Sequence, residues 1–208
     1  MQSIMDIQTN AIRVVFMGTP DIATYPLKAL LEEGYDLVGV ITNPDKPRGR
    51  KGILAPGPVK KLALEKGIPV FQPAKIRLEN DFLPPLQPDL IVTMAYGQIV
   101  PREVLAAPRL SCLNLHGSLL PKYRGAAPMQ RAIINGEPET GCSLMEMVEK
   151  MDEGKVYATE RFPITEEDDY GSVSTKMGLA GAKIIREYLP RFIRGELPAE
   201  EQEAGEAP

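Results

Sequence analysis

Residues 113–130 read Leu-Asn-Leu-His-Gly-Ser-Leu-Leu-Pro-Lys-Tyr-Arg-Gly-Ala-Ala-Pro-Met-Gln, and the rest of the chain is organised around them. An apolar run, Leu110 to Leu115, carries Asn114 and leads directly to His116, the only histidine in 208 residues. Side chains two apart in a strand share a face, so Asn114 and His116 would point the same way. The pattern predicts an amide beside an imidazole at the carboxyl end of a strand, where open α/β sheets bind ligands.

Asn114 and His116 allow a structural and a catalytic interpretation. A single histidine is most often a hydrogen-bonded group at the end of a strand. The asparagine on the same face and the adjoining Gly-Ser turn favour catalysis instead. This pair suits acyl transfer without a covalent nucleophile, because histidine can accept a proton or stand as a cation beside a developing oxyanion while asparagine donates a hydrogen bond to it.

The remaining apolar runs predict an α/β fold. A continuous run at 90–94, Leu-Ile-Val-Thr-Met, is typical of a central parallel strand covered on both faces. Strand patterns fall at residues 11–17, 37–42, 68–72, 90–94, 110–115, 141–148 and 156–164, and helical patterns at 22–33, 59–66, 75–86, 102–107, 127–135 and 170–194. Asp21 is the expected N-cap of the first helix and Gly34 its terminating residue. The order predicts a Rossmann-like, doubly wound, mostly parallel sheet of about seven strands.

Residues Asn43 to Pro58 hold four prolines and three glycines in sixteen positions, so no regular structure is expected there. The segment also carries Lys46, Arg48, Arg50 and Lys51. These charges are either ordinary surface charges or a basic loop that contacts phosphates. Because the loop follows a strand at the binding edge of the sheet, its position favours the phosphate interpretation.

The imidazole needs a carboxylate to hold it, and four candidates lie near the turn at 149–155. They are Glu146, Glu149, Asp152 and Glu153, and spacing alone does not choose among them. The turn separates two strands that are expected to be antiparallel, with Gly154 in the left-handed position.

Composition indicates a cytoplasmic protein without a metal centre. Cys112 and Cys142 lie in apolar runs and are expected to be buried thiols, and one histidine with two separated cysteines does not make a zinc site. No apolar run approaches the ~20 residues that span a bilayer, and Met1 to Asn10 lacks the features of a secretory signal. The net charge is −4, but Glu196 to Pro208 holds five glutamates and no lysine or arginine, which leaves +1 for the rest.

The motifs resemble the signature of the folate-dependent formyltransferases. The resemblance rests on Asn-Leu-His-Gly-Ser-Leu-Leu-Pro at 114–121 and Tyr-Arg-Gly-Ala-Ala-Pro at 123–128. Gly-Thr-Pro-Asp at 18–21, the loop at 43–58, Pro-Val-Phe-Gln-Pro at 69–73 and Ala-Tyr-Gly at 95–97 are similar to the branch that acts on methionyl-tRNA. The likeness runs from about Arg13 to Gly195.

The resemblance implies formyl transfer from 10-formyltetrahydrofolate to the amino group of initiator methionyl-tRNA, with no metal. It implies that Asn114 and His116 stabilise the oxyanion and that Asp152 orients His116. In the family's Asp turn a threonine and a second aspartate stand where this chain has Glu153 and Lys155. The residues that match its folate-contacting stretch are Ser118, Leu119, Leu120 and Pro121. Those that match its tRNA-contacting loop are Arg48, Arg50 and Lys51.

The resemblance also predicts the domain organisation. We expect a flexible extension over 1–10, a catalytic domain with the formyltransferase fold over 11–195 and an acidic linker or tail over 196–208, without the family's C-terminal tRNA-binding domain. The protein is expected to be monomeric and not to bind membranes. Competing interpretations are a sugar-nucleotide formyltransferase, a glycinamide ribonucleotide formyltransferase and an inactive folate-binding module.

Overall fold

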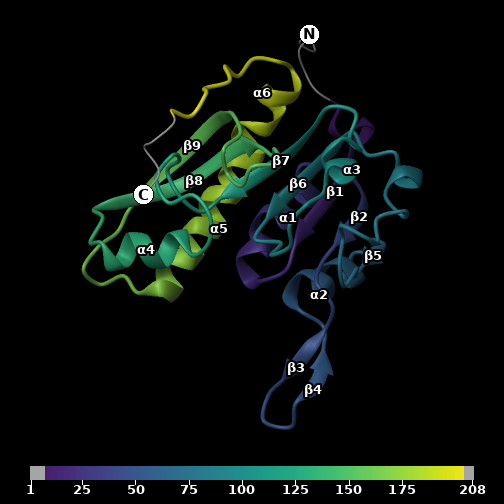
Figure 1. The fold of residues 1–208 in the computed structure, drawn as a ribbon, viewed down its shortest axis with the longest axis horizontal. Coiled ribbons are helices and arrows are strands. Elements are labelled where there is room, and N and C mark those ends of the chain that lie inside the picture. Colours follow the sequence, from purple (N-terminus) through teal and green to yellow (C-terminus); the bar gives the residue numbers. More distant parts are fainter. Residues whose placement is uncertain (1–7, 204–208) are drawn as a thin grey trace.

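The centre of the molecule is a seven-stranded sheet, seen in a computed structural model that describes residues 8–203 (Figure 1). Its strand order is β5-β2-β1-β6-β7-β8-β9. The first five of these strands are parallel, whereas β8 and β9 are antiparallel to their neighbours. The bounds are β1 Arg13–Gly18, β2 Asp36–Ile41, β5 Val70–Phe71, β6 Leu90–Met94, β7 Ser111–His116, β8 Glu139–Glu146 and β9 Val156–Pro163. The predicted α/β class and the mostly parallel sheet of seven strands are confirmed.

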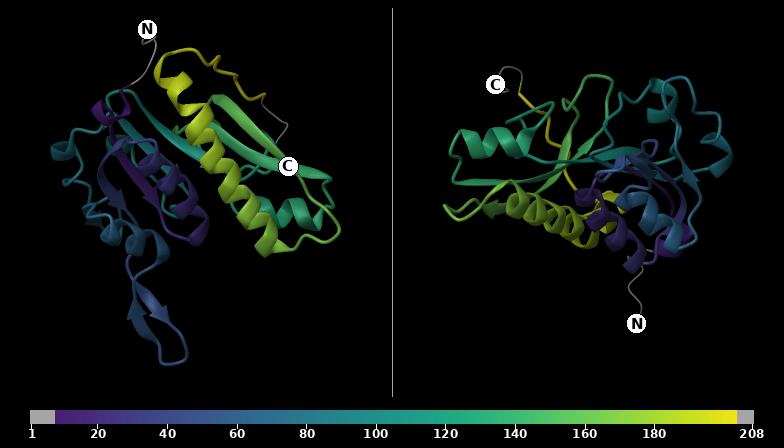
Figure 2. Two further views of the ribbon diagram at one scale, coloured as in Figure 1. Left: turned by 180° about the vertical axis from the view of Figure 1, so that it is seen from behind. Right: turned by 90° about the horizontal axis from the view of Figure 1, so that it is seen from below.

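Helices and loops cover both faces of the sheet. The helices are α1 Asp21–Glu32, α2 Pro58–Glu65, α3 Arg102–Leu105, α4 Pro128–Ile134, α5 Tyr170–Glu187 and α6 Leu189–Ile193. Apolar residues of α1, α2 and α5 pack on one face, and α1 and α5 lie side by side there (Figure 2). On the other face α3 packs with the segment between β5 and β6. Leu90, Val92 and Met94 of β6 enter the first core and Ile91 enters the second, which explains the continuous apolar run.

The ends of the domain pack onto it within the described residues. Thr9–Ala11 form a short 3-10 helix, η1, and the Thr9 hydroxyl donates to the carbonyl of Glu33 over 2.6 Å. Residues 1–7 of the expected flexible extension, and 204–208 of the expected tail, lie outside the described residues. The division at 195 and 196 stays a prediction.

The basic segment forms a β-hairpin, so the prediction of no regular structure there is wrong. Strands β3 (Lys46–Arg48) and β4 (Ile53–Ala55) pair antiparallel and project away from the body of the domain (Figure 1). Each strand of a two-stranded ribbon is an edge, where a proline such as Pro47 is tolerated. Gly49 and Gly52, with φ of 72° and 60°, allow the tight reversal between the strands.

Three helix predictions also need correction. Residues 75–86 form turns with only a 3-10 helix, η2, at Pro84–Leu86, because the side chains of Gln98 and Asn80 bond the backbone of Ile76 instead. The helix expected over 170–194 is broken into α5 and α6, since Pro190 has no N–H to continue it. Asp21 is the first residue of α1 and Pro20 is its N-cap.

Candidate active site

Strand β7 places Asn114 and His116 on one face at the carboxyl edge of the parallel sheet, as predicted. Leu113 and Leu115 point into the core beneath α1 and α5, and the two polar residues alternate with them onto the opposite face. Neighbouring strands flank both positions. Asn114 pairs with Thr93 of β6 and Met145 of β8, and His116 pairs with Ser143 of β8.

The side-chain amide of Asn114 is free to bind a ligand. It is half-buried, and no hydrogen-bond partner for it exists within residues 8–203. In the adjacent strand the buried hydroxyl of Thr93 is also without a partner among the described residues. Because polar groups in a folded protein are normally hydrogen-bonded, the partly exposed and unpartnered Asn114 amide fits a site that receives a polar ligand, with the buried Thr93 hydroxyl beside it.

The imidazole of His116 is buried between two loops. Its Nε2 lies 2.8 Å from the carbonyl oxygen of Tyr123, which can only accept, so Nε2 carries a hydrogen in this arrangement. Its Nδ1 lies 3.5 Å from Oδ2 of Asp152, an ion-pair distance that is longer than an ordinary hydrogen bond. The ring therefore has an oxygen acceptor at each nitrogen.

Asp152 is held in an uncommon backbone conformation. Its φ is +57°, and Oδ2 accepts a hydrogen bond from the N–H of Gly125 over 2.7 Å. The prediction that Gly154 takes the left-handed position is wrong, because Asp152 takes it. Gly154 is required for a steric reason: a Cβ there would lie 1.8 Å from the carbonyl oxygen of Glu146.

The structure separates Asp152 from its three rivals. Within the described part of the chain, Asp152 is the carboxylate among the four that lies within ion-pair distance of His116. Glu149 binds Arg102, whose hydrogen bond holds the pKa of the Glu149 carboxylate below its ordinary value. Glu153 lies 3.9 Å from Lys150 on the exposed side of the turn. Spacing could not identify this choice, because the turn meets β7 only in the folded chain.

Ser118 to Pro121 form the start of the loop after β7. Ser118 is fully buried, and its hydroxyl donates to the carbonyl of Lys122 over 2.5 Å. Ser143 of β8 fixes the loop from below, since its hydroxyl donates to the Ser118 carbonyl over 2.6 Å and accepts from the Leu120 N–H over 3.2 Å. The loop is therefore braced against the same strand that pairs with His116.

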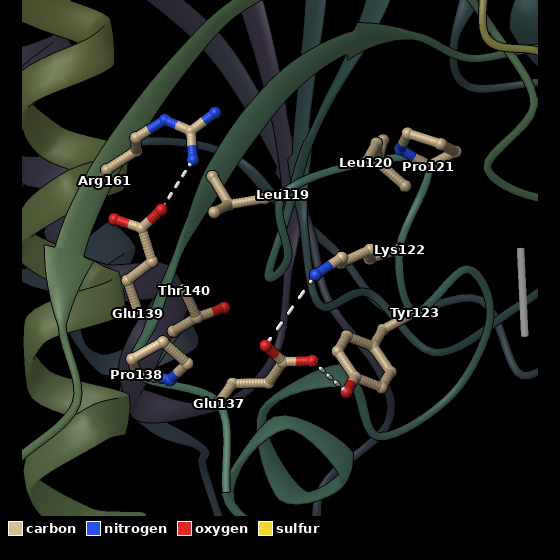
Figure 3. A pocket seen from close by; sticks show the side chains of 10 residues that line it. All are labelled: Leu119, Leu120, Pro121, Lys122, Tyr123, Glu137, Pro138, Glu139, Thr140 and Arg161. Atoms are coloured by element: carbon tan, nitrogen blue, oxygen red, sulfur yellow. Dashed lines mark hydrogen bonds and ion pairs between the residues drawn. The ribbon is translucent and has the colours of Figure 1, made fainter. Parts of the chain in front are cut away.

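A pocket of about 310 Å³ lies on the outer side of this loop (Figure 3). Leu119, Leu120 and Pro121 line it, together with Lys122, Tyr123, Arg161 and residues 137–140. Its charged side chains pair with one another: Lys122 with Glu137 at 3.7 Å and Arg161 with Glu139 at 2.9 Å. Of the predicted folate-contacting residues, three line this pocket and Ser118 lies beneath them.

The basic residues Arg48, Arg50 and Lys51 are exposed on the β3–β4 hairpin. The base of the hairpin is fixed by Asp45, which accepts hydrogen bonds from Gln72 at 2.8 Å and Lys60 at 3.0 Å. These bonds, that of Gln72 above all, hold the pKa of Asp45 below its ordinary value.

The loops after β2 and β6 meet beside this base. The side chain of Asn43 donates to the carbonyl of Tyr96 over 2.6 Å, and Gln98 donates back to the Asn43 side chain over 2.7 Å. These bonds bring the two loops together at the carboxyl edge of the sheet.

Both cysteines are free and buried, as predicted. Burial raises the pKa of the Cys112 thiol to about 12 and also raises the pKa of Cys142. Across residues 8–203, no three His, Cys, Asp or Glu side chains gather as metal ligands. No helix in that same span is long and apolar enough to cross a membrane.

The fold and this histidine-centred site define a class: the chain belongs to the formyl transferase family, whose sequence pattern it matches over residues 12–189. It is 47% identical over 197 residues to the methionyl-tRNA formyltransferase of Bacillus subtilis (strain 168), covering 94% of this chain and 62% of that protein. The methionyl-tRNA formyltransferase of Enterococcus faecalis is 46% identical over 201 residues, covering 94% of this chain and 64% of that protein. The chain thus spans about three fifths of the length of these curated relatives.

Solved structures share the fold at low sequence identity. A glycinamide ribonucleotide transformylase from Symbiobacterium toebii superposes with a TM-score of 0.76 at 20% identity, covering 97% of this chain and 100% of that one. An N-formyltransferase from Helicobacter canadensis, in complex with folinic acid and dTDP-3-aminofucose, has a TM-score of 0.70 at 22% identity, covering 93% of this chain and 68% of that one.

Proposed function

We propose that this chain transfers a formyl group from 10-formyltetrahydrofolate to the amino group of initiator methionyl-tRNA. The observation that carries the proposal is the cluster of an unpartnered Asn114 amide, His116 on the same face, and Asp152 at 3.5 Å from the ring. A relative that is 47% identical to this chain and named methionyl-tRNA formyltransferase supports methionyl-tRNA as the acceptor. We place the reaction in the cytoplasm and expect the protein to act as a monomer.

Asn114 and His116 would act on the formyl oxygen. The amine would attack the electrophilic formyl carbon of the donor, whose oxygen gains negative charge. The tetrahedral intermediate would then collapse by breaking the bond between that carbon and the folate nitrogen, which takes up a proton as the amine loses one. The Asn114 amide would donate to that oxygen, which is worth roughly 3–4 kcal/mol in the transition state. Nε2 of His116 would donate as well if the oxygen replaced the Tyr123 carbonyl as its acceptor. Asp152 would orient the ring through Nδ1.

The folate would be held along residues 118–121. Leu119, Leu120 and Pro121 offer partly exposed apolar surface on a loop braced by Ser143, whereas Ser118 would contribute through its backbone because its side chain is buried. Asn114 would supply its unpartnered amide for the polar end of the donor, beside the buried hydroxyl of Thr93.

The experiment that tests this function offers the protein three amines in parallel: methionyl-tRNA, glycinamide ribonucleotide and an amino sugar nucleotide, each with the formyl donor. We expect formylation of methionyl-tRNA only. Preferential formylation of either other amine would replace the proposal by the corresponding formyltransferase. Folate binding in calorimetry without formylation of any of the three would identify an inactive folate-binding module.

We propose that the β3–β4 hairpin contacts the phosphates of the tRNA. Replacing Arg48, Arg50 and Lys51 together with alanine is expected to weaken tRNA binding. The slope of log affinity against log salt should fall by about 2–3, since each lost phosphate contact removes roughly 0.7–0.9. Filter binding across a salt series measures both quantities.

A matched control removes the same charge elsewhere. Lys28, Lys66 and Arg77 are exposed and lie outside the hairpin, and their joint replacement by alanine should leave the salt slope nearly unchanged. Equal effects of the two triple variants would show that net charge, and not the hairpin, determines tRNA binding.

A further inference from the structure

The segment after α6 returns to the active site instead of leaving the domain. Residues 196–203 run back beside β9 (Figure 1). The backbones of Val156 and Glu200 exchange two hydrogen bonds, each 2.9 Å long. This contact places the following residues against the turn that carries Asp152. The segment lies beyond the family match, which ends at residue 189.

Both the nitrogen and the oxygen of the Gln202 carboxamide form hydrogen bonds, and these bonds connect two loops of the site. Its Nε2 donates to the carbonyl of Asp152 over 2.8 Å and to the carbonyl of Gly154 over 2.7 Å. Its Oε1 accepts from Nε of Arg124 over 3.0 Å. Arg124 belongs to the same loop as Tyr123, whose carbonyl contacts His116. One side chain therefore links the loops that hold the two sides of the imidazole.

Gln202 bonds to the backbone of Asp152, the residue of the turn that has a left-handed conformation. A left-handed conformation at a residue other than glycine is uncommon and persists where the surrounding structure enforces it. The Asp152 carboxylate is held by the Gly125 N–H, and the Asp152 carbonyl is held by Gln202. These two hydrogen bonds therefore fix both the side chain and the backbone of Asp152.

We propose that Gln202 is a positioning residue that aims the Asp152 carboxylate at Nδ1 of His116. Without its two N–H bonds, the carbonyls at 152 and 154 would lose their partner and the turn could relax toward a less strained backbone. The catalytic consequence rests on the proposed function. The positioning itself does not, so it is tested first without substrate.

His116 is the only histidine in the sequence, so the Cε1–H of its imidazole gives one signal in a proton–carbon NMR spectrum that no other histidine overlaps, and this is the ring signal to follow. The spectrum is recorded for the unchanged chain and for Gln202→Ala, Asp152→Asn and Glu203→Ala. Glu203 is the matched control, because it is the exposed neighbour of Gln202. We expect Gln202→Ala to move the ring signal in the same direction as Asp152→Asn, and Glu203→Ala to leave it in place.

An unmoved signal in Gln202→Ala, with a displaced one in Asp152→Asn, would overturn the proposal. Gln202→Glu keeps the size of the side chain and an acceptor for Arg124 but has no N–H for the two carbonyls. It is expected to move the signal as Gln202→Ala does, and it supplies the same test if the alanine variant does not fold.

Formylation kinetics then separate positioning from function. Because small misplacements of catalytic groups reduce rates steeply, we expect Gln202→Ala to lower kcat roughly 10- to 100-fold while KM for the acceptor changes little. A displaced ring signal in a chain that formylates no amine would leave the positioning role standing and refute the proposed function. An unchanged kcat with an unmoved signal would reject Gln202 as a positioning residue.

Discussion

Replacing His116 with alanine is expected to lower kcat for formyl transfer by about 10²- to 10⁴-fold, the range that a single acid–base side chain contributes. The substitution removes the ring that connects the Tyr123 carbonyl to the Asp152 carboxylate. It also leaves Asp152 with Gly125 as its remaining side-chain contact in the described structure. Steady-state formylation of methionyl-tRNA, with both substrates saturating, measures the loss.

The control for this prediction is His116→Gln. Glutamine can donate to the Tyr123 carbonyl and so preserves the loop, but it has no imidazole. We expect it to be as inactive as the alanine variant, with the circular dichroism spectrum of the unchanged chain and an unchanged affinity for the folate. Near-normal turnover in either variant would remove His116 from the mechanism.

The second large effect is expected at Asn114. Asn114→Ala should reduce kcat by about 10²- to 10³-fold, because it deletes a donor aimed at charge that develops in the transition state. The amide makes no hydrogen bond among residues 8–203, so its removal leaves no protein group without a partner. The melting temperature should therefore stay close to that of the unchanged chain while the rate falls, and a thermal melt beside the kinetic assay shows both.

Asn10 provides a matched comparison for Asn114. It is exposed in η1, immediately before β1 and at the opposite edge of the sheet. Asn10→Ala should leave kcat unchanged. If Asn114→Ala unfolded the protein, or if it slowed the reaction no more than Asn10→Ala does, the amide would have a structural role and not a catalytic one.

The local parts of the fold could be predicted from the sequence because they depend on nearby residues. The strand at 90–94 is buried along its whole length, as its continuous apolar run predicts. Asn114 and His116 share a face because the period of a strand is two. The hairpin at 46–55 was missed because prolines and glycines are poor strand formers, yet a two-stranded ribbon accepts them at its edges and in its turn.

The rest of the site depends on contacts between residues distant in sequence. Which carboxylate meets His116 is decided by how the turn after β8 folds against the loop after β7, thirty-six residues apart between His116 and Asp152. Gln202 carries no local signal at all, since its three partners lie in two other segments. The requirement for glycine at position 154 also comes from a distant contact, since a Cβ there would collide with the Glu146 carbonyl oxygen.

The burial of both thiols has a practical consequence for chemical labelling. Cys112 and Cys142 are inaccessible, and burial raises the pKa of each, so little of the reactive thiolate exists at neutral pH. Maleimide reagents should leave the folded, unaltered chain almost untouched. A cysteine introduced on the exposed β3–β4 hairpin, for instance by Ile53→Cys, would then react with a fluorophore selectively over the two buried cysteines. Distance changes between that dye and a labelled tRNA could be followed without first removing the native cysteines.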